Sequence, residues 1–264
     1  MNTLDSLRDL DVPTMTTVVV VAVIAILVAP DAVLGRRHYG RLVAGLAAAP
    51  DDASRDSVRR RFYRSWTWLG WLSGPVAVTA VALLPGVGLA DLGLRLPDLS
   101  LLAPGADRDD AAGMAAGAVV GMLVGVGVLV LLRRRLPRRQ TATIDAMWPT
   151  TPAARRGWSG LALSAGVTEE ITYRGLLVLA LALVAPGLPH GAVVAVVAVL
   201  FGLAHWYQGR LGMLTTGALG AVFTQLYLST GSLLLPMLVH VLIDLRPLLD
   251  RPEPAEAHTL ADAR

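Results

Sequence analysis

The stretch "WSGLALSAGVTEEITYRGLLVLALALVA", residues 158–185, is long and apolar enough to cross a bilayer, yet it contains two adjacent glutamates and an arginine. A helix that crosses a hydrocarbon core of ~30 Å needs about 20 mostly apolar residues. A charged side chain at the bilayer centre costs at least ~2.5 kcal/mol. Glu169, Glu170 and Arg174 must therefore pair or line a water-filled cavity, so the stretch predicts a membrane helix with a polar site inside it.

The composition of the whole chain also indicates a membrane protein. Of its 264 residues 54% are hydrophobic and only 16% are charged, whereas about a quarter of a soluble domain is charged. The absence of cysteine excludes disulfides, thiol nucleophiles and cysteine-ligated metals. All 23 basic residues are arginines, and the net charge is only +3. Arginines at the edges of apolar blocks favour a membrane partner, and nucleic-acid binding is not expected.

Apolar blocks of suitable length predict an all-α, polytopic transmembrane bundle with seven spans, within a range of six to eight. The predicted spans are residues 14–34, 66–89, 111–132, 158–185, 191–206, 210–229 and 232–249. The loops 35–65 and 133–157 carry eight and seven arginines, and the segment 90–110 has five aspartates against two arginines. By the positive-inside rule, this asymmetry predicts an N-terminus outside and a C-terminus in the cytoplasm.

The chain is expected to divide into three parts. Residues 1–150 hold the N-terminal membrane helices with their arginine-rich cytoplasmic loops, residues 151–250 hold the chemistry, and the polar tail 251–264 is expected to be disordered. The start, "MNTLDSLRDLDVPT", lacks the basic region and cleavage site of a signal peptide. The first apolar block is therefore expected to stay in the mature protein as a membrane anchor.

Helical spacing predicts how the charges of the fourth span are used. Glu170 and Arg174 are four residues apart, so they share one face of a helix and can form an ion pair. Glu169 is rotated by ~100° from its neighbour and points elsewhere. The pair alone is also consistent with a purely structural role, but that interpretation leaves Glu169 unexplained.

Two later spans carry further ionisable groups. His205 ends the fifth span in "FGLAHWYQGR", where a histidine beside Trp and Tyr is also typical of an interfacial anchor. His240 and Asp244 lie four residues apart in "HVLID", so the carboxylate can orient the imidazole; a proton relay or a packing role is the alternative. Together with Glu169, these groups predict a funnel open to the cytoplasm, with Glu169 deepest and His205 nearest the mouth.

Three short motifs on these spans resemble those of a known family. "EEITYR" (169–174), "FGLAH" (201–205) and "HVLID" (240–244) resemble the EExxxR, FxxxH and HxxxN/D motifs of the CAAX prenyl endopeptidase and bacteriocin-processing family, also called CPBP or Abi. Its members are intramembrane glutamate proteases. The resemblance covers about residues 155–249, and the three motifs occur in the family's order on successive predicted spans.

The resemblance implies a role for each matched residue. Glu169 would activate water with support from Glu170 and Arg174, and Phe201 would pack the second motif. Asp244 stands where the family more often has Asn, and an ionised Asp cannot donate a hydrogen bond to an oxyanion. Asp244 is therefore either protonated or limited to orienting His240. The predicted catalytic residues are Glu169, Glu170, Arg174, His205, His240 and Asp244.

The residues leave open whether a metal takes part. A metal-free glutamate protease without a cofactor is favoured, because the resemblance to the family implies it. Two histidines and a glutamate also make a zinc-ligand set, which would consist of Glu169, His205 and His240.

The leading functional prediction is an intramembrane endopeptidase of the bacterial plasma membrane that hydrolyses peptide bonds in a membrane-embedded or lipidated protein or peptide. A non-enzymatic scaffold or immunity-type protein that binds a partner in the same cavity is the alternative. A proton-coupled transporter is a third reading, because ionisable residues within spans also mark proton paths. The polar groups lie toward the cytoplasmic side of the predicted spans, which argues against a path through the bilayer.

Overall fold

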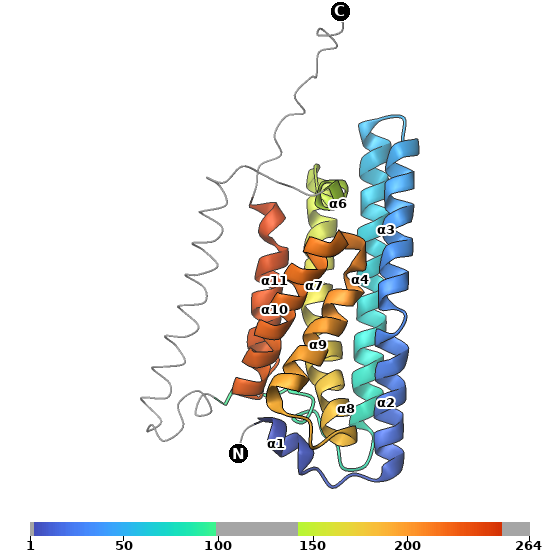
Figure 1. The fold of residues 1–264 in the computed structure, drawn as a ribbon. Coiled ribbons are helices and arrows are strands. Elements are labelled where there is room, and N and C mark those ends of the chain that lie inside the picture. The colour runs from blue at the N-terminus through green and yellow to red at the C-terminus, as the bar shows by residue number, and fades with distance from the viewer. Residues whose placement is uncertain (1–2, 99–141, 250–264) are drawn as a thin grey trace, which may run out of the picture.

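The protein is represented by a computed structural model that describes residues 3–98 and 142–249, and every secondary-structure element in these ranges is a helix (Figure 1). The predicted all-α class is confirmed for this part of the chain. The predicted span 111–132 and the predicted disordered tail 251–264 lie outside the described residues.

The N-terminal helices form one side of the bundle. They are α1 (Thr3–Arg8), α2 (Thr14–Val28), α3 (Asp31–Ala48) and α4 (Asp52–Ala82). Helices α2 and α3 follow one another almost in line, and α4 runs back beside them (Figure 1). Pro30 stands at the junction, where its missing N–H ends α2 and its fixed backbone begins α3.

The arginine-rich segment 35–65, predicted as a loop, is helical instead. It forms most of α3 and the start of α4, and only residues 49–51 connect the two helices. Arg, Ala and Leu are strong helix formers, and Asp51 caps α4 by accepting a 2.8 Å hydrogen bond from the Ser54 backbone N–H. The same N–H lowers the pKa of Asp51. The arginines are thus held on a helical hairpin that projects at one end of the molecule (Figure 1).

The C-terminal half contains the remaining helices. They are α6 (Ala142–Met147), α7 (Pro152–Glu170), a π-helical segment (Ile171–Leu176), α8 (Leu177–Val184), α9 (His190–Ala204), a 3-10 turn (Trp206–Gln208), α10 (Gly209–Thr230), α11 (Leu234–Asp244) and a last 3-10 turn (Arg246–Leu248). Helix α7 packs against α4 and α11, while α9 and α10 form an antiparallel pair. A Cβ atom at Gly202 would lie 2.8 Å from the Met213 carbonyl oxygen, so this glycine allows the pair to approach closely.

The stretch 158–185 differs from an uninterrupted membrane helix in one respect. The helix predicted over 158–185 begins earlier, at Pro152, and is interrupted by the π-helical segment Ile171–Leu176, all of whose residues are buried. Single π-helical turns inside α-helices are frequent at functional sites. This one follows the two glutamates directly and contains Arg174.

Two described helical stretches are long and apolar enough to cross a membrane. They are Thr14–Ala48 and Trp206–Thr230, which contain 18-residue windows with mean hydropathies of 2.7 and 1.3. Helix α9 is apolar but shorter. Large apolar side chains are exposed on both stretches, for example Ile26 at 72% and Leu214 at 71%. The count of seven spans stays a prediction.

Candidate active site

The three predicted motifs meet at one pocket of about 260 Å³. Glu169, His205, His240 and Asp244 line this pocket, whereas Glu170 and Arg174 lie behind its wall, fully buried. The pocket walls come from α7, from the end of α9 and from α11, with further residues from α3, α4 and α10. Four of the six predicted site residues therefore face the pocket, and the other two support them.

Glu170 and Arg174 form the ion pair that their spacing predicted. Nη1 of Arg174 lies 2.9 Å from Oε1 of Glu170, and neither side chain is exposed. Arg174 also donates a 3.3 Å hydrogen bond to the Gly220 carbonyl of α10, and its guanidinium lies 4.3 Å from the Phe201 ring centroid. One buried arginine thus ties α9 and α10 to the π-helical segment, and its charge is compensated as burial requires.

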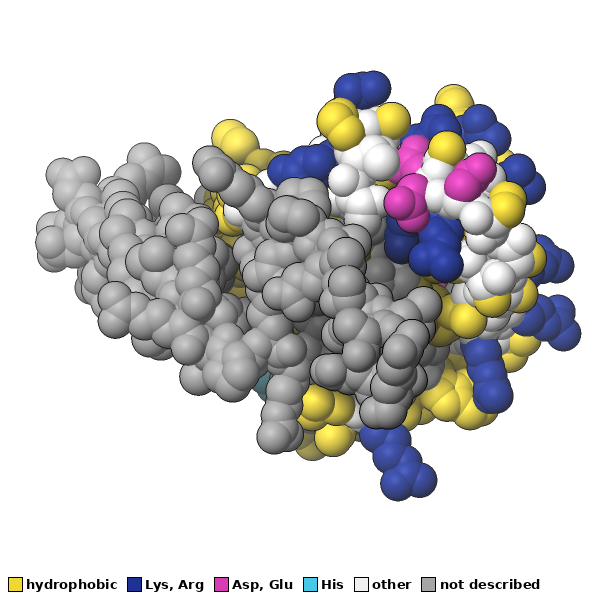
Figure 2. Space-filling model, turned by 90° about the horizontal axis from the view of Figure 1, so that it is seen from above, with side chains coloured by type: hydrophobic (Ala, Val, Ile, Leu, Met, Phe, Trp, Pro, Cys, Tyr) yellow, Lys and Arg dark blue, Asp and Glu magenta, His cyan; other side chains and the backbone are white. Residues whose placement is uncertain are grey.

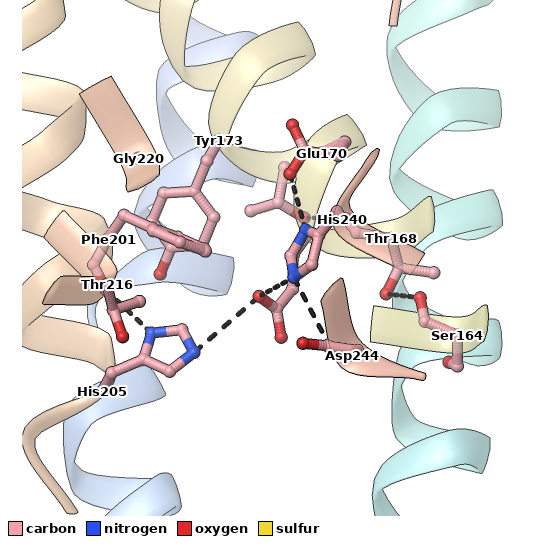
Figure 3. Close-up of polar contacts among 12 residues, drawn as sticks. Ser164, Thr168, Glu170, Tyr173, Phe201, His205, Thr216, Gly220, His240 and Asp244 are labelled. Atoms are coloured by element: carbon pink, nitrogen blue, oxygen red, sulfur yellow. Dashed lines mark hydrogen bonds and ion pairs between the residues drawn. The ribbon is translucent and has the colours of Figure 1, made fainter. Parts of the chain in front are cut away.

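Glu170 makes the closest carboxylate contact with the His240 ring, and Asp244 lies farther away. Nδ1 of His240 lies 2.7 Å from Oε1 of Glu170 (Figure 3). A carboxylate only accepts, so Nδ1 carries the proton and donates it. Asp244 Oδ2 lies 3.6 Å from the other ring nitrogen, Nε2, beyond ordinary hydrogen-bond distance. The i,i+4 spacing brings Asp244 near the ring, but α7 supplies the closer carboxylate.

His205 is fixed in a similar way from its own helix. It caps the C-terminus of α9, and its Nδ1 lies 2.9 Å from the Phe201 carbonyl oxygen. Because a carbonyl only accepts, Nδ1 is again the donor. The centroid of the Phe201 ring lies 4.8 Å from that of His205 and 6.1 Å from that of His240, so Phe201 packs against both imidazoles.

Glu169 faces both imidazoles. Its Oε2 atom lies 3.9 Å from Nε2 of His205 and 3.9 Å from Nε2 of His240. Figure 3 shows the two rings reaching toward the same part of the pocket from opposite sides. This oxygen is buried and accepts no hydrogen bond from any described residue, while the side chain as a whole is 31% exposed. The carboxylate is therefore positioned between two basic nitrogens without being committed to either.

The sequence reasoning missed an acidic residue of the pocket. Asp31, at the start of α3, accepts a 2.7 Å hydrogen bond from the Tyr173 hydroxyl, and both residues line the pocket. Asp31 lies at the end of the first predicted span, outside the four spans that carry the predicted site residues. The signal that would have found Asp31 is its position after Pro30 in the apolar run "LVAPDAVLG".

The pocket extends toward the end of the bundle that carries the arginines. Phe62, Met147 and Trp158 line it there, and the Trp158 indole donates a 2.7 Å hydrogen bond to the Asp244 carbonyl. Figure 2 views the molecule from this end and shows arginine side chains along the outer edge of the described part.

The distances between the Glu169, His205 and His240 side chains do not match those of a zinc site. Zinc bonds of about 2.0–2.2 Å in tetrahedral geometry would bring the ligand atoms to roughly 3.3 Å from one another. The Glu169 oxygen is 3.9 Å from each imidazole nitrogen. Within residues 3–98 and 142–249, no group of three His, Asp or Glu side chains is arranged to hold a metal ion.

A comparison with protein families identifies residues 155–246. No curated protein and no solved structure matches the chain. Residues 155–246 match the family model described as type II CAAX prenyl endopeptidase Rce1-like, and this range contains all three motifs. The resemblance predicted from the motifs is thereby confirmed. The chain carries, over residues 155–246, a domain of the Rce1-like type II CAAX prenyl endopeptidase family, a family of membrane proteins, and this membership implies a CAAX-type peptidase.

Proposed function

We propose that the protein is an intramembrane endopeptidase in which Glu169 activates a water molecule to hydrolyse a peptide bond of a membrane-embedded or lipidated protein. One observation carries this proposal. The buried Oε2 atom of Glu169 has no hydrogen-bond partner among the described residues, and it lies 3.9 Å from the Nε2 atoms of His205 and His240.

The spacing suits a water molecule as the reactant. A separation of 3.9 Å is too long for a direct hydrogen bond, but one water can bridge it. In the proposed reaction the Glu169 carboxylate takes a proton from this water while the water oxygen bonds to the scissile carbonyl carbon. Glu169 then returns the proton to the amide nitrogen as the carbon–nitrogen bond breaks. The products are a carboxylic acid and an amine, and the carboxylate is regenerated.

His240 is the candidate for stabilising the charge on the tetrahedral intermediate. As an imidazolium it donates from Nδ1 to Glu170 and directs its Nε2 proton into the pocket, where the oxyanion forms. Three carboxylates, those of Glu169, Glu170 and Asp244, lie around this ring, so a positive charge on His240 is compensated. Glu170 and Arg174 act as positioning residues, because Glu170 holds the His240 imidazole, Arg174 pairs with Glu170, and neither lines the pocket.

The pocket walls favour an apolar substrate segment. Aromatic and aliphatic side chains dominate the wall toward the arginine-rich end, among them Phe62, Trp66, Leu69 and Trp158. With the positive-inside rule, we place this opening on the cytoplasmic side. A lipidated or hydrophobic peptide entering there reaches Glu169 through an apolar passage.

The direct test uses the full chain in proteoliposomes. Cleavage of a prenylated peptide ending in a CAAX sequence is compared with cleavage of the same peptide without the prenyl group. Glu169→Gln keeps the size of the side chain and removes the base, and we expect kcat to fall by about 10²–10⁴-fold. Asp52→Asn, at an exposed position in the first turn of α4, is the matched control and should retain full activity.

The same variants separate catalysis from binding. Equal turnover by the wild type and by Glu169→Gln would remove Glu169 from the reaction. A second outcome would support the non-catalytic binding function instead of a peptidase. In it, the wild type cleaves neither peptide, and cells that contain Glu169→Gln at the wild-type protein level behave like wild-type cells.

A further inference from the structure

A second concavity lies between α4 and α7 and shares no lining residue with the proposed active site. It has a volume of about 410 Å³. We call it the α4–α7 groove; it is lined by Ser57, Arg60, Arg61, Arg64 and Thr67 of α4 and by Ala153, Arg156, Gly157 and Gly160 of α7. Four of its nine lining residues are arginines and none is acidic.

Three of these arginines have no acidic partner among the described residues. Arg60 pairs with Asp56 at 2.7 Å. Arg61, Arg64 and Arg156 are exposed, and they form no hydrogen bond or ion pair with another residue of the described ranges. Three guanidinium groups around one concavity create a strongly positive local potential and offer planar donors to an anion such as a phosphate group.

Both walls of the groove continue as exposed apolar surface. On α4, Trp68, Trp71 and Leu72 lie four, seven and eight residues after Arg64, so they share its face of the helix. They are 70%, 38% and 66% exposed. On α7, Leu163 lies seven residues after Arg156 and is 49% exposed. A positive groove therefore passes directly into an apolar surface on two adjacent helices.

A positive groove followed by an apolar surface is complementary to a lipid that has an anionic headgroup and an apolar acyl chain. Tryptophans concentrate at the level of the lipid headgroups, and basic pockets between membrane helices bind acidic headgroups. We propose that the α4–α7 groove binds an anionic phospholipid, with the phosphate against Arg61, Arg64 and Arg156 and an acyl chain along the apolar surface that follows. A soluble phosphate would satisfy the arginines but would leave the apolar continuation unused.

The test measures lipid binding by the full chain in a neutral detergent. Phosphatidylglycerol, phosphatidylcholine and inorganic phosphate are added separately, and retained lipid is quantified by native mass spectrometry while the melting temperature is followed. We expect the protein to retain phosphatidylglycerol and to melt at a higher temperature with it, but to respond little to the zwitterionic lipid or to phosphate.

Two variants and one control locate the binding site. Arg61→Gln/Arg64→Gln/Arg156→Gln should weaken phosphatidylglycerol binding by roughly 100-fold, since each arginine contributes about fivefold near an anionic surface. Arg37→Gln/Arg41→Gln/Arg55→Gln removes the same charge from exposed positions outside the groove and should bind normally.

Gly160→Leu fills the groove without changing charge. A Cβ atom at Gly160 meets nothing closer than Thr67 at 3.9 Å, so the backbone accepts a side chain there. This variant should lose phosphatidylglycerol binding while its melting temperature without lipid is maintained.

Several results would overturn the proposal. Equal loss of binding in both arginine triplets would reduce the effect to net charge. Equal retention of the two lipids, or a thermal shift by phosphate as large as that by phosphatidylglycerol, would exclude an anionic lipid site. Unchanged binding by Gly160→Leu would place the lipid elsewhere.

Discussion

The Nδ1 atom of His240 lies 2.7 Å from Oε1 of Glu170, and this hydrogen bond joins α11 to α7 across 70 residues of sequence. The same carboxylate oxygen lies 2.9 Å from Nη1 of Arg174. Glu170 therefore has two functions, compensating a buried arginine and orienting an imidazole. Its neighbour Glu169 lies on the pocket side of the helix, and its Oε2 atom has no hydrogen-bond partner among the described residues.

The first prediction concerns the buried ion pair. Glu170→Met leaves the Arg174 charge unpaired in the interior and should destabilise the protein by about 3–5 kcal/mol. Arg174→Met should cost less, because His240 still contacts Glu170. The double variant should recover most of the stability but remain inactive, since Nδ1 of His240 has then lost its acceptor. Unfolding in mixed micelles and kcat/KM on the same samples measure both effects.

The outcome for the double variant decides this prediction. Recovered activity along with recovered stability would show that Glu170 contributes only charge compensation. Additive destabilisation by the two substitutions would contradict the ion pair itself.

The second prediction concerns Asp244. Loss of a carboxylate that orients a catalytic histidine costs about 10⁴-fold in kcat. Because Glu170 performs this task here, Asp244→Asn should lower kcat/KM by about tenfold at most, a change of about 1.4 kcal/mol. Glu170→Gln is the comparison and should lose far more activity. A larger loss from Asp244→Asn than from Glu170→Gln would reverse the two assignments.

The third prediction concerns the contact between α7 and α11. A Cβ atom at Gly166 would lie 2.5 Å from Cγ2 and 2.9 Å from the backbone N of Val241, so Gly166→Ala must push α11 away from α7. We expect a destabilisation of about 1–3 kcal/mol and a fall in kcat, because His240 moves with α11. Gly160→Ala on the same helix has room and should raise the melting temperature slightly.

The pair of glycine variants distinguishes a specific contact from a general effect of alanine. Thermal unfolding and turnover should change together for Gly166→Ala and not for Gly160→Ala. If Gly166→Ala retains wild-type turnover, the position of His240 does not depend on this contact.

The fourth prediction concerns metal. Glu169, His205 and His240 are too widely spaced for a tetrahedral zinc site as placed. Protein that is dialysed against a chelator, with its metal content checked by mass spectrometry, should keep its peptidase activity. Loss of activity that added zinc restores would assign these three residues to a metal.

Much of the site was predictable because it depends on local spacing. Glu170 and Arg174 are four residues apart, and a helical turn brings such residues together whatever the rest of the fold does. The apolar length of residues 158–185 predicted a membrane helix, and helical structure covers this stretch up to Val184. The segment 35–65, predicted as a loop, is helical, and so are residues 142–147 and 152–157 of the predicted loop 133–157. Asp244 lies 3.6 Å from Nε2 of His240 as its spacing predicts, but Glu170 makes the closer contact with the ring.

The sequence alone determined the order of the motifs, the apolar blocks and the residue pairs that share a helix face. Each of these depends on interactions between residues close in the sequence or on the transfer of apolar side chains from water into the membrane. Only the tertiary structure decided that Glu170 holds His240, that Asp31 reaches Tyr173, and that three arginines from two helices face one groove. These relationships depend on which helix faces lie against each other. Close packing at small residues such as Gly166 and Gly202 determines which helix faces are in contact. A pattern of neighbouring residues in the sequence does not predict these contacts.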